Sequence, residues 1–176
     1  MNKVKARIIQ PTMDGLASEG ILYKGFIFFG LINVNGDPYV IEYNARLGDP
    51  ESEVIIPRIS SDFFELIEGV AYGTLADKII EFDNRFVTTV MLVSGGYPGS
   101  YKKGIEISGL NNVKDSVVFH AGTKMDSGKV VTAGGRVLSV SSWGQTLREA
   151  LSCSFRSASK LSFENMYYRT DIGFDL

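Results

Sequence analysis

The sequence predicts a mixed α/β (α+β) protein in two parts. Residues 1–72 combine helical segments with a hairpin of two apolar strands around the turn Asn35-Gly36-Asp37-Pro38. Residues 86–176 contain short β-branched strands separated by turns and then an amphipathic helix, a pattern typical of a mostly antiparallel, β-rich domain covered by a helix. The polar, weakly periodic residues 73–85 are the predicted linker.

The elements of the first part follow from periodicity and from chain breakers. Residues 4–19 carry a rough helical stripe, in which Pro11 should kink the helix or start a second one. Residues 25–34 are almost continuously apolar, which indicates a strand buried on both faces, and residues 39–44 form its hairpin partner. The loop that follows runs over residues 46–57.

A helix is predicted after this loop, and most of the strands lie beyond the linker. Asp62 is a suitable N-cap for the helix over residues 63–71. The strands and the covering helix of the second part are expected at residues 86–93, 117–124, 130–132, 136–141 and 145–161.

Composition narrows the function classes. Of the 176 residues 44% are hydrophobic and 22% charged, values of an ordinary globular protein. The net charge of −2, without a basic stripe, argues against nucleic acid as a partner. The single Cys153 excludes an intrachain disulfide, and no apolar run reaches the length of a membrane span or a signal peptide core. These observations predict a cytoplasmic protein without a membrane partner.

The end of the second strand of the hairpin carries the residues that point to chemistry. Side chains alternate along a strand, so Glu42 and Asn44 should share a face, and Arg46 joins them if the strand continues. A carboxylate and an amide oxygen are ligands suited to Mg²⁺, and an arginine binds phosphate or carboxylate. Such a short pattern also fits the polar face of a plain hairpin. The loop that follows favours the site, because it supplies a glycine, an acid and a proline, Gly48-Asp49-Pro50.

Four other features have simpler interpretations. The loop Gly95-Gly96-Tyr97-Pro98-Gly99 lacks the lysine and hydroxyl of a P-loop, so a tight turn is favoured over a phosphate site. His120 has no nucleophile motif around it and is interpreted as a hydrogen-bonded structural residue, and Cys153 as a core residue. Arg169 and Asp171 either form a local polar clasp or are surface decoration.

Several separated stretches together match one known family. They are Gln10-Pro11-Thr12, Tyr23-Lys24-Gly25-Phe26, Val40 to Glu51, Gly95-Gly96-Tyr97-Pro98-Gly99, His120-Ala121-Gly122-Thr123, Gly134-Gly135-Arg136-Val137-Leu138 and Tyr168-Arg169-Thr170-Asp171-Ile172-Gly173. In this order they resemble the C-terminal part of the phosphoribosylamine–glycine ligases, also called glycinamide ribonucleotide synthetases, of the ATP-grasp superfamily, and the similarity covers essentially the whole chain.

The resemblance implies an ATP-dependent, ADP-forming ligase of de novo purine (IMP) biosynthesis. Glycine would become glycyl phosphate, and 5-phosphoribosylamine would attack it to give glycinamide ribonucleotide. Carried over to this sequence, Glu42 and Asn44 would hold Mg²⁺ or Mn²⁺ on the ATP phosphates. Arg46 would be the catalytic contact to phosphate or acyl phosphate, and Gly48, Asp49 and Pro50 would line the substrate side.

The resemblance also implies that part of the enzyme lies outside this chain. Residues 1–72 would be the end of an ATP-grasp lobe and residues 86–176 the family's C-terminal domain. The phosphate-gripping lysines, the glycine-rich flap and the adenine site would lie in an N-terminal part, a required partner. We therefore expect no ligase activity from the chain alone. The chain also departs mildly from the family's loop pattern after Glu51. It has Ser52-Glu53-Val54, where the family often has threonine followed by glutamine or glutamate.

Two other functions remain open at this point. Another ATP-grasp carboxylate–amine ligase, or a biotin-carboxylase-like lobe, would share Glu-x-Asn-x-Arg on a strand, although the two loops containing Gly48 and Gly95 argue against it. A non-catalytic scaffold with a vestigial metal site is the second alternative. Self-association through apolar surface around Phe26 and Phe28 is a further hypothesis.

Overall fold

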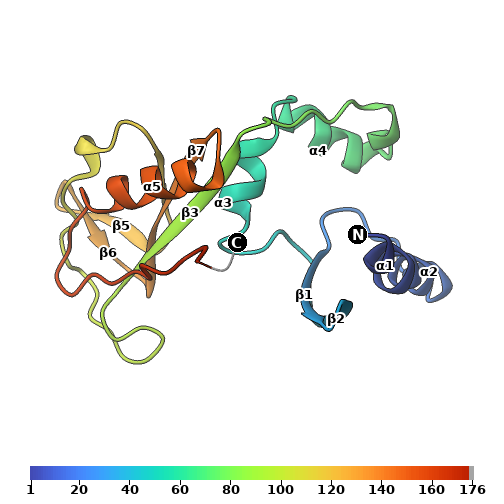
Figure 1. The fold of residues 1–176 in the computed structure, drawn as a ribbon, viewed down its shortest axis with the longest axis horizontal. Helices are drawn as coiled ribbons and strands as arrows, with labels where there is room; N and C mark the ends of the chain where they lie inside the picture. The colour runs from blue at the N-terminus through green and yellow to red at the C-terminus, as the bar shows by residue number, and fades with distance from the viewer. Residues whose placement is uncertain (175–176) are drawn as a thin grey trace. The chain divides into compact units, whose positions relative to one another are not determined.

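The structure, a computed structural model, describes residues 1–174, so the last two residues of the predicted domain 86–176 lie outside the described part (Figure 1). The chain divides into two compact units. We call Met1–Asp49 with Ser61–Ile80 the hairpin unit. Pro50–Ser60 with the described residues from Glu81 onward form the three-stranded unit.

The hairpin unit begins with one helical stretch in three parts. These are α1 (Asn2–Val4), the π-helical η1 (Lys5–Ile9) and α2 (Gln10–Ser18). Pro11 lies at the start of α2, and because its nitrogen carries no hydrogen it cannot donate an α-helical hydrogen bond. The helix accommodates Pro11 by widening into a π turn directly before α2. The sequence had predicted a kink there or the start of a second helix.

Gly20 ends this helix as predicted. Its φ of +68° is left-handed, and its N–H donates to Ala17 O at 3.1 Å, while the N–H of Ile21 donates to Leu16 O at 2.9 Å. This pair of hydrogen bonds is a Schellman motif, which satisfies carbonyls at the helix end.

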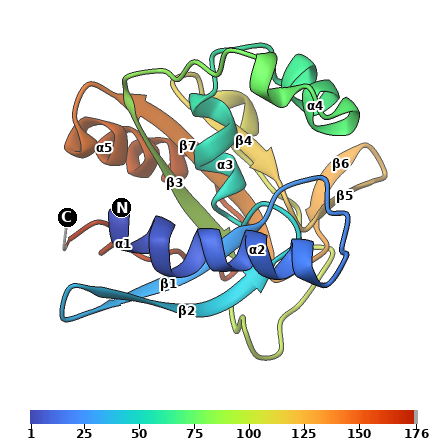
Figure 2. The ribbon, with the colours of Figure 1, turned by 90° about the vertical axis from the view of Figure 1, so that its right-hand side faces the viewer.

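Two antiparallel strands, β1 (Phe28–Val34) and β2 (Asp37–Asn44), form the predicted hairpin, and the helical stretch runs alongside it (Figure 2). Asn35 and Gly36 have φ of +52° and +84°, the conformation of a tight two-residue turn. The expectation that the first strand is buried on both faces is wrong, since Leu31 and Ile32 are 37% and 48% exposed. The reason is that the described sheet has only these two strands.

The helix α4 (Phe63–Tyr72) completes the hairpin unit and is followed by the 3₁₀ turn η3 (Leu75–Asp77). The predicted cap is confirmed, because the Asp62 carboxylate accepts from the N–H groups of Phe64 and Glu65 at 2.8 and 3.2 Å. The Phe63 ring stacks on Phe26 with centroids 6.4 Å apart.

Residues 46–57 are not the continuous loop that the sequence predicted. A short helix α3 (Ser52–Ile55) and the 3₁₀ turn η2 (Ile56–Arg58) lie there, too brief to show a periodic pattern. The part from Pro50 to Ser60 belongs to the three-stranded unit, and within it Arg58 O accepts from Asp83 N–H at 2.7 Å and Glu53 O accepts from Ser141 Oγ at 2.8 Å. The sequence had placed it with residues 1–72.

An antiparallel sheet of order β3-β7-β4 is the centre of the three-stranded unit. The predicted strand 117–124 is divided in two around Gly122, whose N–H donates to Arg136 O at 2.8 Å. The elements are β3 (Phe86–Val93), η4 (Leu110–Asn112), β4 (Val117–His120), β5 (Thr123–Asp126), β6 (Lys129–Thr132), β7 (Arg136–Gly144) and α5 (Leu147–Ala158). The mostly antiparallel, helix-covered architecture is confirmed.

The helix α5 packs on β3 and β7 (Figure 1) and begins with a capping box. Thr146 Oγ1 accepts from Glu149 N–H at 3.1 Å, and Glu149 Oε2 accepts from Thr146 N–H at 3.3 Å. At the corner before it, a Cβ on Gly144 would lie 2.3 Å from Ala150 N, so only glycine fits.

A core of fully buried aliphatic residues lies beneath α5, together with buried hydroxyls that the sequence analysis did not identify. Ser154 Oγ, for example, is within 2.9 Å of Thr88 Oγ1. Cys153, predicted to be core, is partly exposed and donates from Sγ to Asp115 O. The aliphatic residues with no exposed surface are Val90, Leu92, Val137, Leu138 and Val140.

Candidate functional site

Glu42 and Asn44 lie at the end of β2, and their side chains meet as predicted. Asn44 Nδ2 donates to Glu42 Oε1 at 2.9 Å, which requires both side chains to be on one face of the hairpin. Both are accessible, Glu42 being exposed and Asn44 half-buried. The pairing leaves the second carboxylate oxygen and the amide oxygen of Asn44 as acceptors, with the amide orientation assigned from this hydrogen bond.

A β-bulge just before the pair sets which face it occupies. Gly30 is opposite Glu42 and Leu31 is opposite Val40, so Ile41 is the extra residue of β2. The bulge changes the alternation, and Val40 and Tyr43, three residues apart, both line a hollow of about 410 Å³ beside α2. Strict alternation along β2 would have placed Glu42 on the same face as Val40, so the sequence pattern did not reveal the bulge.

The start of the loop after β2 is held by Tyr23, from one of the stretches that carry the family resemblance. Its hydroxyl bonds to two carbonyls, Phe26 O at 2.8 Å and Ala45 O at 3.1 Å. Sequence reasoning assigned Tyr23 no role, because a hydroxyl that ties two backbone segments leaves no spacing signal. The tie fixes the backbone directly after Asn44.

Arg46 is in this loop rather than on the strand, because β2 ends at Asn44. The condition for Arg46 to share the strand face is therefore not met. Its Nη1 donates to Leu47 O at 2.9 Å, and the residue is exposed. Gly48 is buried and Asp49 exposed, whereas Pro50 belongs to the three-stranded unit.

The donor set of Glu42 and Asn44 fits a hard divalent cation. One carboxylate and one amide oxygen are oxygen ligands of the kind Mg²⁺ accepts, and Mg²⁺ usually keeps substrate phosphates and waters as its other ligands. Within residues 1–174 no group of three or more His, Cys, Asp or Glu side chains is placed to hold a metal ion.

The glycine-rich loop of the three-stranded unit is a packing element. The Tyr97 ring lies so close to Gly135 that a Cβ there would be 2.1 Å from Tyr97 Cδ2. Ser94 N–H, just before the loop, donates to Gly135 O at 2.8 Å. The favoured interpretation as a tight turn agrees with these contacts. His120 is exposed, with Nδ1 3.0 Å from Thr123 Oγ1, a hydrogen bond of the predicted structural kind.

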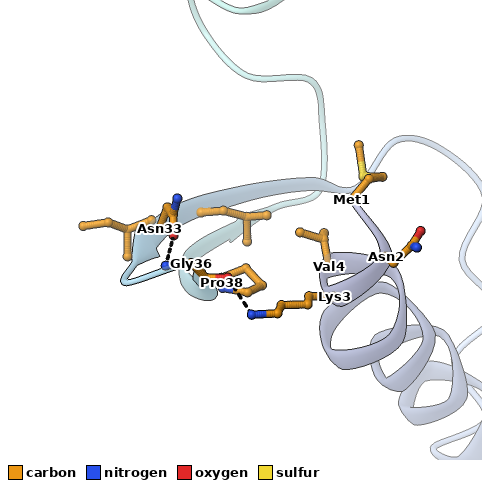
Figure 3. A pocket seen from close by; sticks show the side chains of 9 residues that line it. Met1, Asn2, Lys3, Val4, Asn33, Gly36 and Pro38 are labelled. Atoms are coloured by element: carbon orange, nitrogen blue, oxygen red, sulfur yellow. Dashed lines mark hydrogen bonds between the residues drawn. The ribbon is translucent and has the colours of Figure 1, made fainter. Parts of the chain in front are cut away.

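The hairpin unit contains further hollows besides the one next to α2. One of about 630 Å³ lies at the turn end of the hairpin (Figure 3), where Lys3 Nζ donates to Gly36 O at 2.9 Å and Gly36 N–H donates to Asn33 Oδ1 at 2.9 Å. No predicted site residue lines it. Another, of about 340 Å³, is lined by Asn44 together with Thr12, Leu16, Tyr23, Ile27, Tyr43 and Ala45.

The charged residues with shifted pKa values lie away from the site residues in the sequence. The pKa of Asp37 is lowered by a hydrogen bond from Lys3 and by nearby Arg7. Of the two alternatives left open for Arg169 and Asp171, the contacts show the clasp, since Arg169 donates to both carboxylate oxygens of Asp171 at 2.9 and 3.0 Å and lowers its pKa. No helix among residues 1–174 has the length and apolar character needed to cross a bilayer.

The acidic residue and the asparagine are paired at the end of a hairpin strand, and the segment that contains them matches an ATP-grasp domain. The sequence model described as the ATP-grasp (A) domain of phosphoribosylglycinamide synthetase matches residues 1–52. The model described as the C domain of phosphoribosylglycinamide synthetase matches residues 87–175. The chain belongs to the phosphoribosylglycinamide synthetase family.

Known relatives agree with this assignment. Phosphoribosylamine–glycine ligases from Caldanaerobacter subterraneus subsp. tengcongensis and Escherichia coli O157:H7 are 43% and 45% identical over 172 and 171 residues, which are 98% and 95% of this chain. These stretches are 41% and 40% of the relatives, so the chain spans about two fifths of their length. A trifunctional purine biosynthetic protein from Gallus gallus is 41% identical over 98% of this chain and 17% of its own.

A solved structure also matches. The crystal structure of phosphoribosylamine–glycine ligase from Thermotoga maritima has a TM-score of 0.85 and 36% identity, and the match covers 97% of this chain and 42% of that one. The mixed α/β fold is therefore that of a solved relative.

Proposed function

We propose that this chain is the metal-bearing end of the ATP-grasp domain and the C domain of a ligase that joins glycine to 5-phosphoribosylamine. The products would be glycinamide ribonucleotide, ADP and phosphate, formed through glycyl phosphate in cytoplasmic de novo purine biosynthesis. The observation that carries the proposal is the Glu42–Asn44 pair, 2.9 Å apart at the end of β2 and inside the segment that matches an ATP-grasp domain.

The roles of the side chains follow from their chemistry. Glu42 and Asn44 would hold Mg²⁺ or Mn²⁺, which neutralises charge on the ATP phosphates. Arg46, exposed on the loop, brings a guanidinium fork to phosphate or acyl phosphate. Gly48, Asp49 and Pro50 would line the substrate side. Phosphoryl transfer needs positioning and charge neutralisation more than a protein base, and these residues provide both.

The remaining part of the enzyme is the partner that this proposal requires. The chain spans about two fifths of the ligases it resembles, so the residues that grip the nucleotide from the other side would come from the other three fifths. We therefore expect the chain alone to bind a divalent cation weakly and to show no turnover.

A chimera tests the function. The chain replaces the 171 matching residues of the Escherichia coli ligase, and ADP release is measured with and without glycine and 5-phosphoribosylamine. Release that depends on both substrates supports the proposal, whereas a folded but inactive chimera points to a non-catalytic module. Stimulation by bicarbonate instead of glycine would indicate a biotin-carboxylase-like enzyme.

The site residues are tested in the same chimera. Glu42→Gln keeps the size of the side chain and removes its charge, and should lower kcat by about a hundredfold or more. Glu68→Gln is the matched control, since Glu68 is exposed on α4 and has no proposed role, and it should leave kcat unchanged. Equal activity of both variants would remove Glu42 from the site.

Self-association belongs to the same proposal, with a corrected surface. Phe26 and Phe28 are half-buried, whereas Tyr39, Ile41 and Tyr43 of β2 are 58%, 67% and 54% exposed. An exposed apolar strand is a template for pairing with a second copy. Solution scattering over a concentration series should therefore show dimers, which Ile41→Lys removes. A monomer at every concentration would contradict this part of the proposal.

A further inference from the structure

Gly30 of β1 lies directly across the hairpin from Glu42. We infer that Gly30 is a positioning residue for the Glu42 carboxylate: its missing side chain is the space in which Glu42 lies against the neighbouring strand. The inference rests on the proposed function, because that function makes Glu42 a metal ligand. The placement of the Glu42 side chain can nevertheless be measured without metal or substrate.

The first support is a distance. A Cβ built on Gly30 would lie 2.8 Å from Glu42 Cγ, closer than real Cβ contacts, while the Glu42 backbone N and O would be at an ordinary 3.6 Å. The backbone thus tolerates a side chain at position 30, and the conflict is confined to the side chain of Glu42. Cγ carries the carboxylate, so moving it away from a new methyl group moves both carboxylate oxygens with it.

The second support is the conformation of Gly30 itself. Its φ is not in the left-handed region, unlike that of Gly36 in the turn of the same hairpin. Backbone freedom therefore does not explain a glycine in the middle of a strand, where glycine is unfavourable and often marks a close approach. The close approach here is that of the Glu42 side chain.

The third support is the β-bulge. The extra residue Ile41 is inserted between the Gly30–Glu42 and Leu31–Val40 pairs, so the bulge turns Glu42 to its face directly opposite Gly30. In this position Glu42 Oε1 accepts the 2.9 Å hydrogen bond from Asn44 Nδ2. Bulge, glycine and hydrogen bond together fix one placement of the carboxylate beside the amide.

The test uses the ¹⁵N-labelled chain and follows the side-chain amide signals of Asn44 by NMR, without metal. Gly30→Ala should shift these signals toward their positions in Glu42→Ala, because the displaced carboxylate no longer accepts the hydrogen bond. Gly15→Ala is the matched control, since a Cβ on Gly15 meets nothing within 4 Å, and it should leave the Asn44 signals in place. Unchanged signals in Gly30→Ala would overturn the inference.

A second variant covers the case in which Gly30→Ala does not fold. In Gly30→Ala combined with Glu42→Ala the Cγ is gone, so the hairpin should fold again. If the double variant remains unfolded, the methyl group conflicts with something other than Glu42 and the inference is wrong.

Mn²⁺ then separates this inference from the proposed function. In the wild-type chain Mn²⁺ should broaden the amide signals of Glu42 and Asn44, and Gly30→Ala should require about tenfold more Mn²⁺ for the same broadening. Equal broadening in both would overturn the positioning role toward the metal. If Mn²⁺ leaves the wild-type signals sharp, the proposed metal ligands fail, and the Asn44 signals alone decide the role of Gly30.

Discussion

Two of the antiparallel sheets, the hairpin β1-β2 and the three-stranded sheet β3-β7-β4, differ in what covers them. In the hairpin, Leu31 is 37% and Ile41 67% exposed, whereas Val90 and Leu138 of the three-stranded sheet have no exposed surface. A third strand and the helix α5 close the second sheet, and the first has only two strands. A two-stranded hairpin is marginally stable by itself. The difference teaches that the core which stabilises the chain and the proposed metal ligands Glu42 and Asn44 are in different units.

Truncating a core leucine should give the largest difference between the units. Leu138→Ala in β7 should cost about 2–5 kcal/mol of unfolding free energy through lost burial and a cavity. Leu22→Ala, in the hairpin unit and fully exposed, should change it by no more than about 0.5 kcal/mol. Urea unfolding followed by fluorescence of Trp143, the single tryptophan, reports on the three-stranded unit. Similar midpoints for the two variants would mean that the buried leucine is not part of a cooperative core.

Adding one methyl group should have opposite effects in the two units. Gly144→Ala places a Cβ 2.3 Å from Ala150 N and should destabilise the strand-to-helix corner by about 1–3 kcal/mol. Gly15→Ala in α2 meets open space and should stabilise its helix by up to about 1 kcal/mol. Thermal unfolding followed by circular dichroism measures both. A loss of stability in Gly15→Ala would show that α2 is more tightly packed than its surroundings indicate.

Removing a helix cap should cost about the same in both units, because capping is local. Thr146→Ala and Asp62→Ala each leave N–H groups of the first turn without their acceptor and should each cost about 1 kcal/mol. Hydrogen exchange of the first-turn amides of α5 and α4 measures each loss separately. A much smaller effect for Asp62 would mean that α4 is already frayed in the wild-type chain.

The sequence predicted those features that depend on neighbouring residues. Alternation along the strand brought Glu42 and Asn44 to one face, and the Asp62 cap was read from a single residue type before an apolar stripe. The same reasoning failed for burial of the first strand, because Leu31 is apolar whether or not another layer covers it. Periodicity describes what a strand can bury, and the number of neighbouring strands decides what it does bury.

Features that depend on contacts between residues far apart in the sequence left no periodic pattern. The bulge at Ile41 adds one residue to β2 without a change in composition, and only the pairing of Gly30 with Glu42 reveals it. The buried hydroxyl of Ser154 likewise resembles a surface serine in the sequence until Thr88 is found beside it. The glycine in a strand was the available clue, since glycine there often marks a bulge or a close backbone approach.

The smallest expected effect concerns two half-buried acidic residues, one in each unit. In the three-stranded unit, hydrogen bonds from Arg85 lower the pKa of Asp83 from 3.8 to about 2. In the hairpin unit, Lys3 and Arg7 lower the pKa of Asp37. A lowered folded-state pKa stabilises the fold above the unfolded value near 3.8, and this contribution is lost as pH falls toward 2. Both carboxylates are partly open to solvent, so solvent screening keeps the effect small.

NMR titration of the carboxyl carbons should therefore place the midpoint of Asp83 near pH 2, and Arg85→Gln should return it toward 3.8. Asp83→Asn should make acid unfolding of the three-stranded unit less steep between pH 4 and about 2, because the unfolded chain then loses one group that takes up a proton there. Lys3→Gln should shift only Asp37. If Asp83 titrates near 3.8 in the wild-type chain, the Arg85 contact is too mobile to hold the charge.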